Sequence, residues 1–147
     1  MQQSSNFPNC FYRVTIKGLS VRDGKLLMIK ESNGRWELPG GGLDFSEDIK
    51  LGFEREVKEE MGLKVKHMSE RPVYVWPNHI ANGSGRGIDW FYTLVVAYEV
   101  EFEDLNFTQT NECMELRWYN KEELANLDLT TQMKPLPDIF DPKDFEN

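Results

Sequence analysis

The chain has 147 residues and a formal net charge of −8, and these values limit its size class and its partners. That length fits one domain with its own core, and four tryptophans and nine phenylalanines are too many for a disordered chain. The negative charge argues against stable binding to nucleic acid or to an anionic membrane, but it leaves a small nucleotide as a ligand.

The two cysteines, Cys10 and Cys113, form neither a CxxC pair nor a zinc-binding spacing, so a reducing, cytoplasmic setting is expected. Residues 1–10 lack the basic region and the apolar run of a secretory signal. The longest apolar stretch, near residues 90–97, is too short to span a bilayer, so no membrane partner is expected.

The first third of the chain predicts a hairpin followed by a glycine-rich turn. Residues 11–21 alternate apolar with polar side chains as a strand does, and residues 23–24 (DG) are a hairpin signal. The returning strand, residues 25–30 (KLLMIK), is continuously apolar and is expected at the centre of a sheet. Residues 36–38 (WEL) then lead into residues 39–42 (PGGG), where glycines let the backbone approach a ligand closely.

A helix is predicted from Glu47 to Met61. Ser46 is a suitable N-cap residue, and Gly62 is a natural stop just past the last turn. The apolar residues of the helix recur at every fourth position and make one core-facing stripe, which consists of Ile49, Phe53, Val57 and Met61.

Three carboxylates of this helix border the apolar stripe. At about 100° per residue, Glu56 and Glu60 point close to Ile49, and Glu59 lies next to Glu56. A solvated charged face, the usual meaning of a charge run, would place them opposite the stripe. Gly52, one turn before Glu56, would let metal, water or backbone approach. Crowded acids beside a core are costly without a cation, and oxygen-only ligands favour Mg²⁺, with Mn²⁺ as a substitute.

The second half of the chain predicts strands and one short helix. We expect strands at residues 63–69, 73–76, 90–102 and 113–119, a flexible stretch at 78–87 and a helix at 121–127. The segment from about 128 to 147 is a C-terminal tail, expected to wrap the domain or to be partly disordered. Strands around an acidic helix, followed by a second helix, predict a single α/β domain over residues 1–147 with a mixed sheet between helices.

The segment from Gly41 to Leu63 resembles the Nudix box, which is a glycine, five residues, a glutamate, seven residues, and then R-E-apolar-x-E-E-x-G-apolar. Every defined position is filled, by Gly41, Glu47, Arg55, Glu56, Val57, Glu59, Glu60, Gly62 and Leu63. The flanking residues 36–41 and 112–124 are similar to the family more loosely.

The resemblance implies a Nudix-type α/β/α sandwich with a mixed β-sheet. It also implies a hydrolase that cleaves a nucleoside diphosphate linked to another moiety, with Mg²⁺ or Mn²⁺. In that reading Glu56, Glu59 and Glu60 hold metal, and one of them or a neighbouring acid helps to activate water. Arg55 would orient a glutamate, and Glu47 would support the helix end or the outer metal shell.

The resemblance also implies ligands outside the helix. The Gly40 carbonyl would be a further metal ligand, and Gly41 would support the site as the first residue of the box. Glu112, which precedes Trp118 by six residues, is a candidate ligand or base, because a later acid often completes such sites. An ordinary surface acid in a loop is equally open, and Glu115 could take its place.

Four residues are candidates for contact with substrate. Arg13 and Lys30 could reach phosphates from neighbouring strands, although solvent-facing edge charges are the alternative for each. Trp76 could stack on a base, since aromatic faces suit that contact. Arg86 lies in the flexible stretch and could contact a phosphate.

The main rival is a non-catalytic, nucleotide-sensing module of the same fold, and the complete acid set favours the enzyme. Isopentenyl diphosphate isomerases share the fold, but their extra cysteine and glutamate signatures are not evident. Oxidised nucleoside triphosphates, ADP-ribose, nucleotide sugars and dinucleoside polyphosphates all stay open as substrates. The small-molecule partner expected is therefore a nucleotide or a nucleoside diphosphate derivative, and a homodimer is open.

Overall fold

The computed structural model describes residues 8–81 and 87–145, which build two four-stranded sheets. The first has the order β5-β1-β7-β6, with β1 (Cys10–Leu19), β5 (Gly40–Gly42), β6 (Val65–Ala81) and β7 (Trp90–Phe102). The second is built on β3 and contains β2 (Val21–Arg22), β3 (Lys25–Lys30), β4 (Trp36–Glu37) and β8 (Glu115–Tyr119). In the first sheet β1 and β7 are parallel and the other pairs are antiparallel, so this sheet is mixed.

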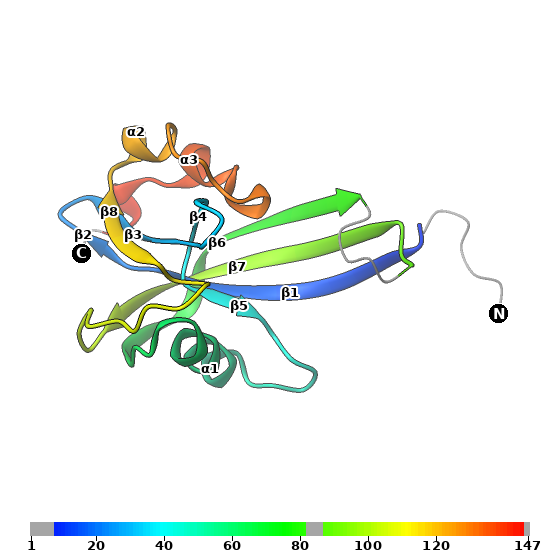
Figure 1. Cartoon of the computed structure of the whole chain (residues 1–147), viewed down its shortest axis with the longest axis horizontal. Helices are drawn as coiled ribbons and strands as arrows, with labels where there is room; N and C mark the ends of the chain where they lie inside the picture. The colour runs from blue at the N-terminus through cyan, green and yellow to red at the C-terminus, as the bar shows by residue number, and fades with distance from the viewer. Residues whose placement is uncertain (1–7, 82–86, 146–147) are drawn as a thin grey trace.

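Helices lie on both sides of the sheets and make an α/β/α sandwich, as Figure 1 shows. On one side lies α1 (Ile49–Met61); on the other lie α2 (Lys121–Leu124) and α3 (Leu136–Ile139), in a segment that also contains η1 (Thr131–Met133) and η2 (Pro142–Phe145). The predicted fold class is confirmed, and a single domain spanning 1–147 stays a prediction. Within the described ranges, no helix combines the length and apolarity that a bilayer crossing requires.

The start of α1 differs from the prediction. The helix begins at Ile49, and the N-cap is Asp48, whose side chain accepts a hydrogen bond from the Leu51 amide at 3.1 Å. Ser46 cannot serve, because it lies two residues further back with a φ of 59° in the left-handed region. The predicted stop is confirmed, since Gly62 caps the helix with a φ of 71°.

One face of α1 packs on the first sheet. Phe53, Val57 and Met61 are fully buried as predicted, whereas Ile49 in the first turn is 38% exposed. Gly18 of β1 makes this packing possible, because a Cβ there would lie 2.6 Å from Cζ of Phe53. The apolar face of α1 is therefore fixed against the sheet, with Glu60 buried beside it.

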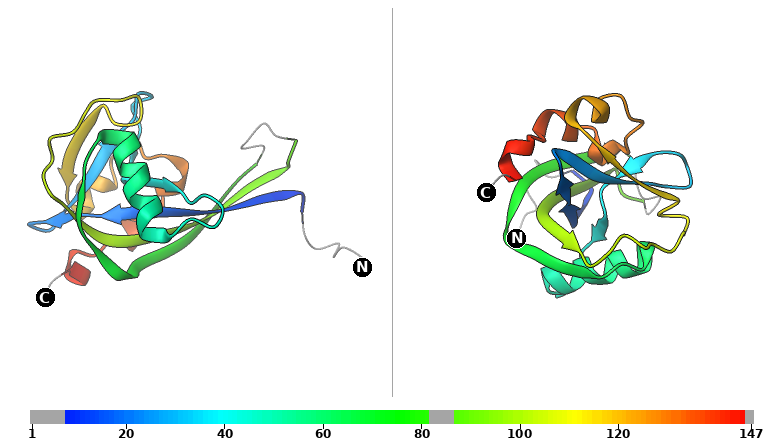
Figure 2. Two further views of the ribbon diagram at one scale, coloured as in Figure 1. Left: turned by 90° about the horizontal axis from the view of Figure 1, so that it is seen from below. Right: turned by 90° about the vertical axis from the view of Figure 1, so that its left-hand side faces the viewer.

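The strand that follows α1 is longer than the sequence predicted. Residues Val65–Ala81 form one strand, so the two short strands that were predicted are joined. The register is irregular between Met68 and Tyr74, where Pro72 has no amide hydrogen to donate to the neighbouring strand. Residues 78–81, which were expected to be flexible, belong to this strand, and residues 82–86 of the expected stretch lie outside the described residues. Figure 2 shows β6, β7 and the start of β1 running beyond the helices as a twisted ribbon.

The C-terminal segment wraps onto the sheets, which is one of the two outcomes expected for it. Its apolar side chains complete the second core and are 0–6% exposed: Leu129, Met133, Leu136 and Phe140. The preceding helix α2 is shorter than predicted and ends at Leu124, and β8 begins at Glu115 instead of Cys113. This wrapped segment covers the face of the sheet opposite α1.

Candidate active site

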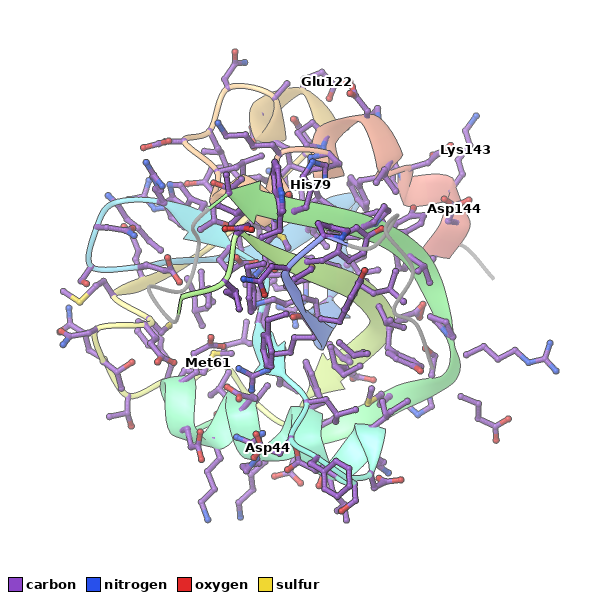
Figure 3. The ribbon with its side chains drawn as sticks, turned by 90° about the vertical axis from the view of Figure 1, so that its right-hand side faces the viewer. Asp44, Met61, His79, Glu122, Lys143 and Asp144 are labelled. Carbon is purple, nitrogen blue, oxygen red and sulfur yellow. The ribbon has the colours of Figure 1, made fainter. Side chains whose placement is uncertain are left out.

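Arg55, in the middle of α1, is the centre of a network of acids. Its Nε and Nη2 donate to Oε2 and Oε1 of Glu47 at 2.7 and 2.9 Å, which is a bidentate pair. Its Nη1 donates to Glu56 at 3.0 Å and to Glu59 at 3.3 Å. Asp44, which Figure 3 shows beside α1, lies 3.4 Å from Nη2. One guanidinium thus holds four carboxylates from the helix and the loop before it.

The loop before α1 brings Glu47 back over the helix. The hydrogen bonds from Arg55 lower the pKa of Glu47 to about 2, so this carboxylate stays ionised near neutral pH. Gly52 makes room for the loop, because a Cβ there would lie 2.7 Å from Oε1 of Glu47 and 2.8 Å from Cδ1 of Leu43. The space that Gly52 was expected to leave is therefore occupied by this loop.

Gly41 leaves room for the carboxylate of Glu56. A Cβ on Gly41 would lie 2.5 Å from Oε2 of Glu56, which is far closer than side-chain atoms pack. The glutamate is about four-fifths buried and extends from α1 toward β5. A glycine at the first position of the acidic motif is thus required sterically.

If Glu56 has the catalytic part that the family resemblance implies, replacement of Gly41 by alanine is expected to displace it and to lower turnover by about 10²-fold, because a displacement of about 1 Å in an active site can cost that much. Gly41 has no positive φ, so backbone strain is not added. Turnover and thermal unfolding of the variant test this. Unchanged turnover would show that the position of Glu56 has no influence on the reaction.

Glu60 is the buried acid of the cluster. It is 4% exposed, and its Oε1 accepts a hydrogen bond from the Gly40 amide at 3.2 Å. Burial is the largest cause that raises its pKa, to about 8, against the opposing effects of Lys17 and of the Gly40 hydrogen bond. The negative charge of Glu112 adds to the rise, so Glu112 acts on the site electrostatically from its exposed loop.

The raised pKa of Glu60 predicts a pH dependence of stability in the absence of metal. Between the ordinary value of 4.5 and about 8, the unfolded chain ionises this group while the folded chain keeps the proton. Stability of the chelated protein should therefore fall across that window and then level off. Thermal unfolding of wild type and of Glu60→Gln in chelator, at several pH values, should show a shallower decline in the variant. Parallel curves would contradict the raised pKa.

A buried ion pair next to Gly40 was missed by the sequence reasoning. Nζ of Lys17 donates to the carbonyls of Gly40 at 2.9 Å and Leu38 at 3.2 Å, and lies 3.4 Å from Oε1 of Glu37. The other oxygen of Glu37 accepts hydrogen bonds from Thr130 and Gln132 of the wrapped C-terminal segment. The alternation of the first strand gave no signal for this, because polar positions were expected to face solvent.

The candidate substrate contacts have different outcomes. Trp76 was wrong as a stacking surface, because it is 4% exposed in the core and donates from Nε1 to the Gln132 carbonyl. Arg13 is half-buried beside Asp44 at 3.5 Å, and Nζ of Lys30 lies 5.8 Å from the ring centre of Trp36.

Two further candidates were named from the sequence, Arg86 and Glu115. Arg86 lies outside the described residues. Glu115, the substitute for Glu112, pairs with Arg117.

A cavity of about 360 Å³ adjoins the buried ion pair. Glu37, Thr130 and Gln132 lie in its wall, together with Asn78 of β6 and Phe91 of β7. The walls thus combine an aromatic ring with amide, hydroxyl and carboxylate groups, and are more polar than the mostly apolar lining of a typical ligand pocket.

The donor set of the helix suits a hard divalent cation. Glu56, Glu59 and Glu60 offer only carboxylate oxygens, and Gly41 leaves a hollow at Glu56 that a Cβ would fill. Within residues 8–81 and 87–145, no three acidic, imidazole or thiol side chains already converge on one point, and Arg55 holds two of the three acids. The residues fit an ion, because Arg55 bonds only one oxygen of Glu56 and one of Glu59, and the other oxygen of each carboxylate can bind the ion.

Comparisons with known proteins agree with this arrangement. The family model described as NUDIX domain matches residues 12–138. The chain is 47% identical over 57 residues to a MutT-like protein of Streptomyces ambofaciens, covering 37% of each chain. It is 33% identical over 105 residues to an ADP-ribose pyrophosphatase of Methanocaldococcus jannaschii, covering 63% of this chain and 62% of that one. The matches thus span less than two thirds of either relative.

A solved structure, that of the ORF135 protein of E. coli, superposes with a TM-score of 0.67 at 25% identity. The superposition covers 88% of each chain, so the similarity includes both sheets and not the acidic helix alone.

Proposed function

The chain belongs to the Nudix family, and on that premise we propose that it is a pyrophosphohydrolase that uses Mg²⁺ or Mn²⁺. The bond cleaved is the diphosphate linkage of a nucleoside diphosphate joined to another moiety. The observation that carries the proposal is that Arg55 donates hydrogen bonds to Glu56 and Glu59, while Glu60, one helical turn after Glu56, is buried.

The residues of α1 have distinct parts in this proposal. Glu56, Glu59 and Glu60 would hold the ion, with the Gly40 carbonyl and Glu112 as further candidate ligands. When bound, such an ion neutralises phosphate charge and lowers the pKa of a water molecule. Either Glu56 or Glu59 accepts the proton of the attacking water, and the Arg55–Glu47 pair keeps both glutamates in place.

The cavity beside Glu37 would receive the nucleotide. Phe91 offers an aromatic face to a base, and Asn78 and Gln132 offer amide groups to its edge. Arg13 stays a candidate contact to phosphate, as do Lys30 and Arg86. Like the relative from Methanocaldococcus, the chain is proposed to accept ADP-ribose or a similar small nucleotide, without stable nucleic-acid binding, in keeping with its net charge of −8.

The test is phosphate or mononucleotide release from a panel of nucleotides. The panel should hold ADP-ribose, nucleotide sugars, dinucleoside polyphosphates, oxidised nucleoside triphosphates and a triphosphorylated oligonucleotide, each with Mg²⁺, with Mn²⁺ and with chelator. Turnover of at least one small nucleotide that chelator abolishes is expected. Tight binding without metal-dependent turnover would support the alternative, a nucleotide-sensing module that does not catalyse.

A cytoplasmic location and a homodimer are also proposed, on separate observations. Both cysteines are free, as in a reducing compartment. The projecting ribbon exposes apolar side chains that a second copy could cover: Tyr12 is 57% exposed, Val75 53% and Trp90 37%. Light scattering at several concentrations tests the dimer, and a constant monomer mass would exclude it.

A further inference from the structure

Glu37 fixes the direction of the Gln132 amide in the wall of the cavity. Glu37 is 4% exposed, and its Oε1 lies 3.4 Å from Nζ of Lys17. A carboxylate paired with an ammonium group only accepts hydrogen bonds. Its Oε2 accepts from Nε2 of Gln132 at 3.1 Å and from the Thr130 hydroxyl at 2.6 Å. The NH₂ group of Gln132 is therefore turned toward Glu37, because the reverse orientation would bring two acceptors together.

The backbone of the same segment is fixed as well. The Gln132 carbonyl accepts from Nε1 of Trp76 on β6 at 2.8 Å. Two residues earlier, the Thr130 amide donates to the Trp36 carbonyl on β4 at 3.1 Å. The place of Gln132 in the wall is thus set by its backbone contacts, and the direction of its amide is set by Glu37.

This arrangement leaves the oxygen of the Gln132 amide open to a ligand. Among residues 8–81 and 87–145, no group donates a hydrogen bond to Oε1 of Gln132, which lines the cavity of about 360 Å³ and is partly exposed. The Thr130 hydroxyl, in the same wall, has used its hydrogen on Glu37 and can accept only. A molecule in the cavity therefore meets acceptors whose positions are fixed.

Asn78, the second amide of the wall, is not fixed in this way. It lies on β6, and its side-chain amide has no hydrogen-bond partner in the described part of the chain. It can turn either its oxygen or its nitrogen toward a ligand, so it accommodates donors and acceptors alike. Selection between bases must therefore come from the fixed amide of Gln132.

We propose that Gln132 is the specificity-determining residue of the nucleotide pocket and that Glu37, as its positioning residue, makes the pocket select bases with an exocyclic amino group. This inference rests on the proposed function, because it concerns the base of the same substrate. Adenine fits best, since its amino group donates to Oε1 while a neighbouring ring nitrogen accepts from the amide NH₂ group. Hypoxanthine carries a carbonyl oxygen in place of that amino group and would face Oε1 acceptor to acceptor.

The test compares ADP-ribose with its hypoxanthine counterpart, inosine diphosphate ribose. Calorimetry in chelator measures binding without turnover, and kcat/KM with Mg²⁺ measures selection during the reaction. Wild type is expected to prefer the adenine nucleotide by about tenfold in both measurements, the size of effect that follows when a polar group of a site is left unpaired. Equal values, or a preference for the hypoxanthine nucleotide, would overturn the inference without use of any variant.

Gln132→Met tests the residue itself. Methionine is unbranched like glutamine but offers no amide, and Glu37 keeps its bonds to Lys17, Thr130 and the Leu38 amide, so no buried charge is left unpaired. The preference for adenine is expected to fall to within about twofold, because the discriminating hydrogen bond is gone. Thermal unfolding shows that the variant folds.

The matched control is Asn78→Ala, which removes the amide that is free to turn. It should weaken binding of both nucleotides by a similar factor and keep the preference for adenine. A preference that survives in Gln132→Met, or that disappears in Asn78→Ala, would overturn the inference.

The inference and the proposed function fail on different results. If no nucleotide of the panel is hydrolysed with Mg²⁺ or Mn²⁺, the pyrophosphohydrolase is removed, while the binding preference in chelator still decides the role of Gln132. If other nucleotides are hydrolysed but neither ADP-ribose nor inosine diphosphate ribose binds, the selection of an amino group is overturned and the enzyme stands.

Discussion

Replacement of Glu56 by glutamine is expected to lower turnover by about 10²- to 10³-fold, the size of effect that follows removal of one electrostatic group from a reacting centre. Glutamine keeps the shape of the side chain and can still accept the hydrogen bond that Arg55 donates at 3.0 Å. What it loses is the negative charge that holds a cation and the basicity that takes a proton from water. Turnover at saturating Mg²⁺ should therefore collapse without a comparable loss of stability.

The matched control is Glu54→Gln, which removes an acid from the same helix. Glu54 borders a separate surface groove with Lys58 and Lys64, and its carboxylate is not among the described hydrogen-bond or ion-pair partners of the Arg55 guanidinium. Its replacement should leave turnover within about twofold of wild type, as surface substitutions usually do. Glu59→Gln should follow Glu56→Gln in direction. Wild-type turnover in either of those two variants would remove the proposed mechanism.

Periodicity placed Glu60 correctly because it is a local property of the chain, whereas the side chain of Glu59, predicted to border the same stripe, is 60% exposed. Phe53 and Val57 are buried and Glu60 beside them is 4% exposed, as an angular step of about 100° per residue predicts. The helix start was wrong because capping depends on the preceding loop. That loop turns Glu47 back onto Arg55, Ser46 adopts a left-handed conformation, and Asp48 becomes the cap.

Burial on the other side of the sheet could not be predicted from local pattern. Alternation in β1 placed Lys17 on a polar face, which in a two-layer protein would face water. Here the C-terminal segment packs over that face, and a contact 95 residues apart in sequence joins Glu37 to Gln132. The same packing buries Trp76 under the Gln132 carbonyl, so its predicted role failed for the same reason. The functional groups of one helix could therefore be predicted from the sequence, whereas a site built from several distant segments could not.

Replacement of Arg55 by lysine is expected to lower turnover by about 10- to 100-fold, with a smaller change in KM, because the residue positions the acids and is not proposed to touch substrate. Lysine keeps the positive charge but cannot reproduce a planar fork that holds Glu47 through two hydrogen bonds and also reaches Glu56 and Glu59. Released from the guanidinium, the glutamates would lose the fixed geometry that the reaction needs.

The pH dependence of stability separates this positioning role from a general loss of folding. Glu47 has a pKa of about 2 in the folded protein against an ordinary value of 4.5, so its pairing stabilises the fold above pH 4.5 and stops doing so as the pH falls toward 2. The difference in melting temperature between wild type and Arg55→Lys should therefore be present at pH 7 and shrink across that window. Arg71→Lys, an exposed substitution on β6, should show neither effect. If the difference in melting temperature stayed constant down to pH 2, Arg55 would stabilise the fold by something other than its two hydrogen bonds to Glu47.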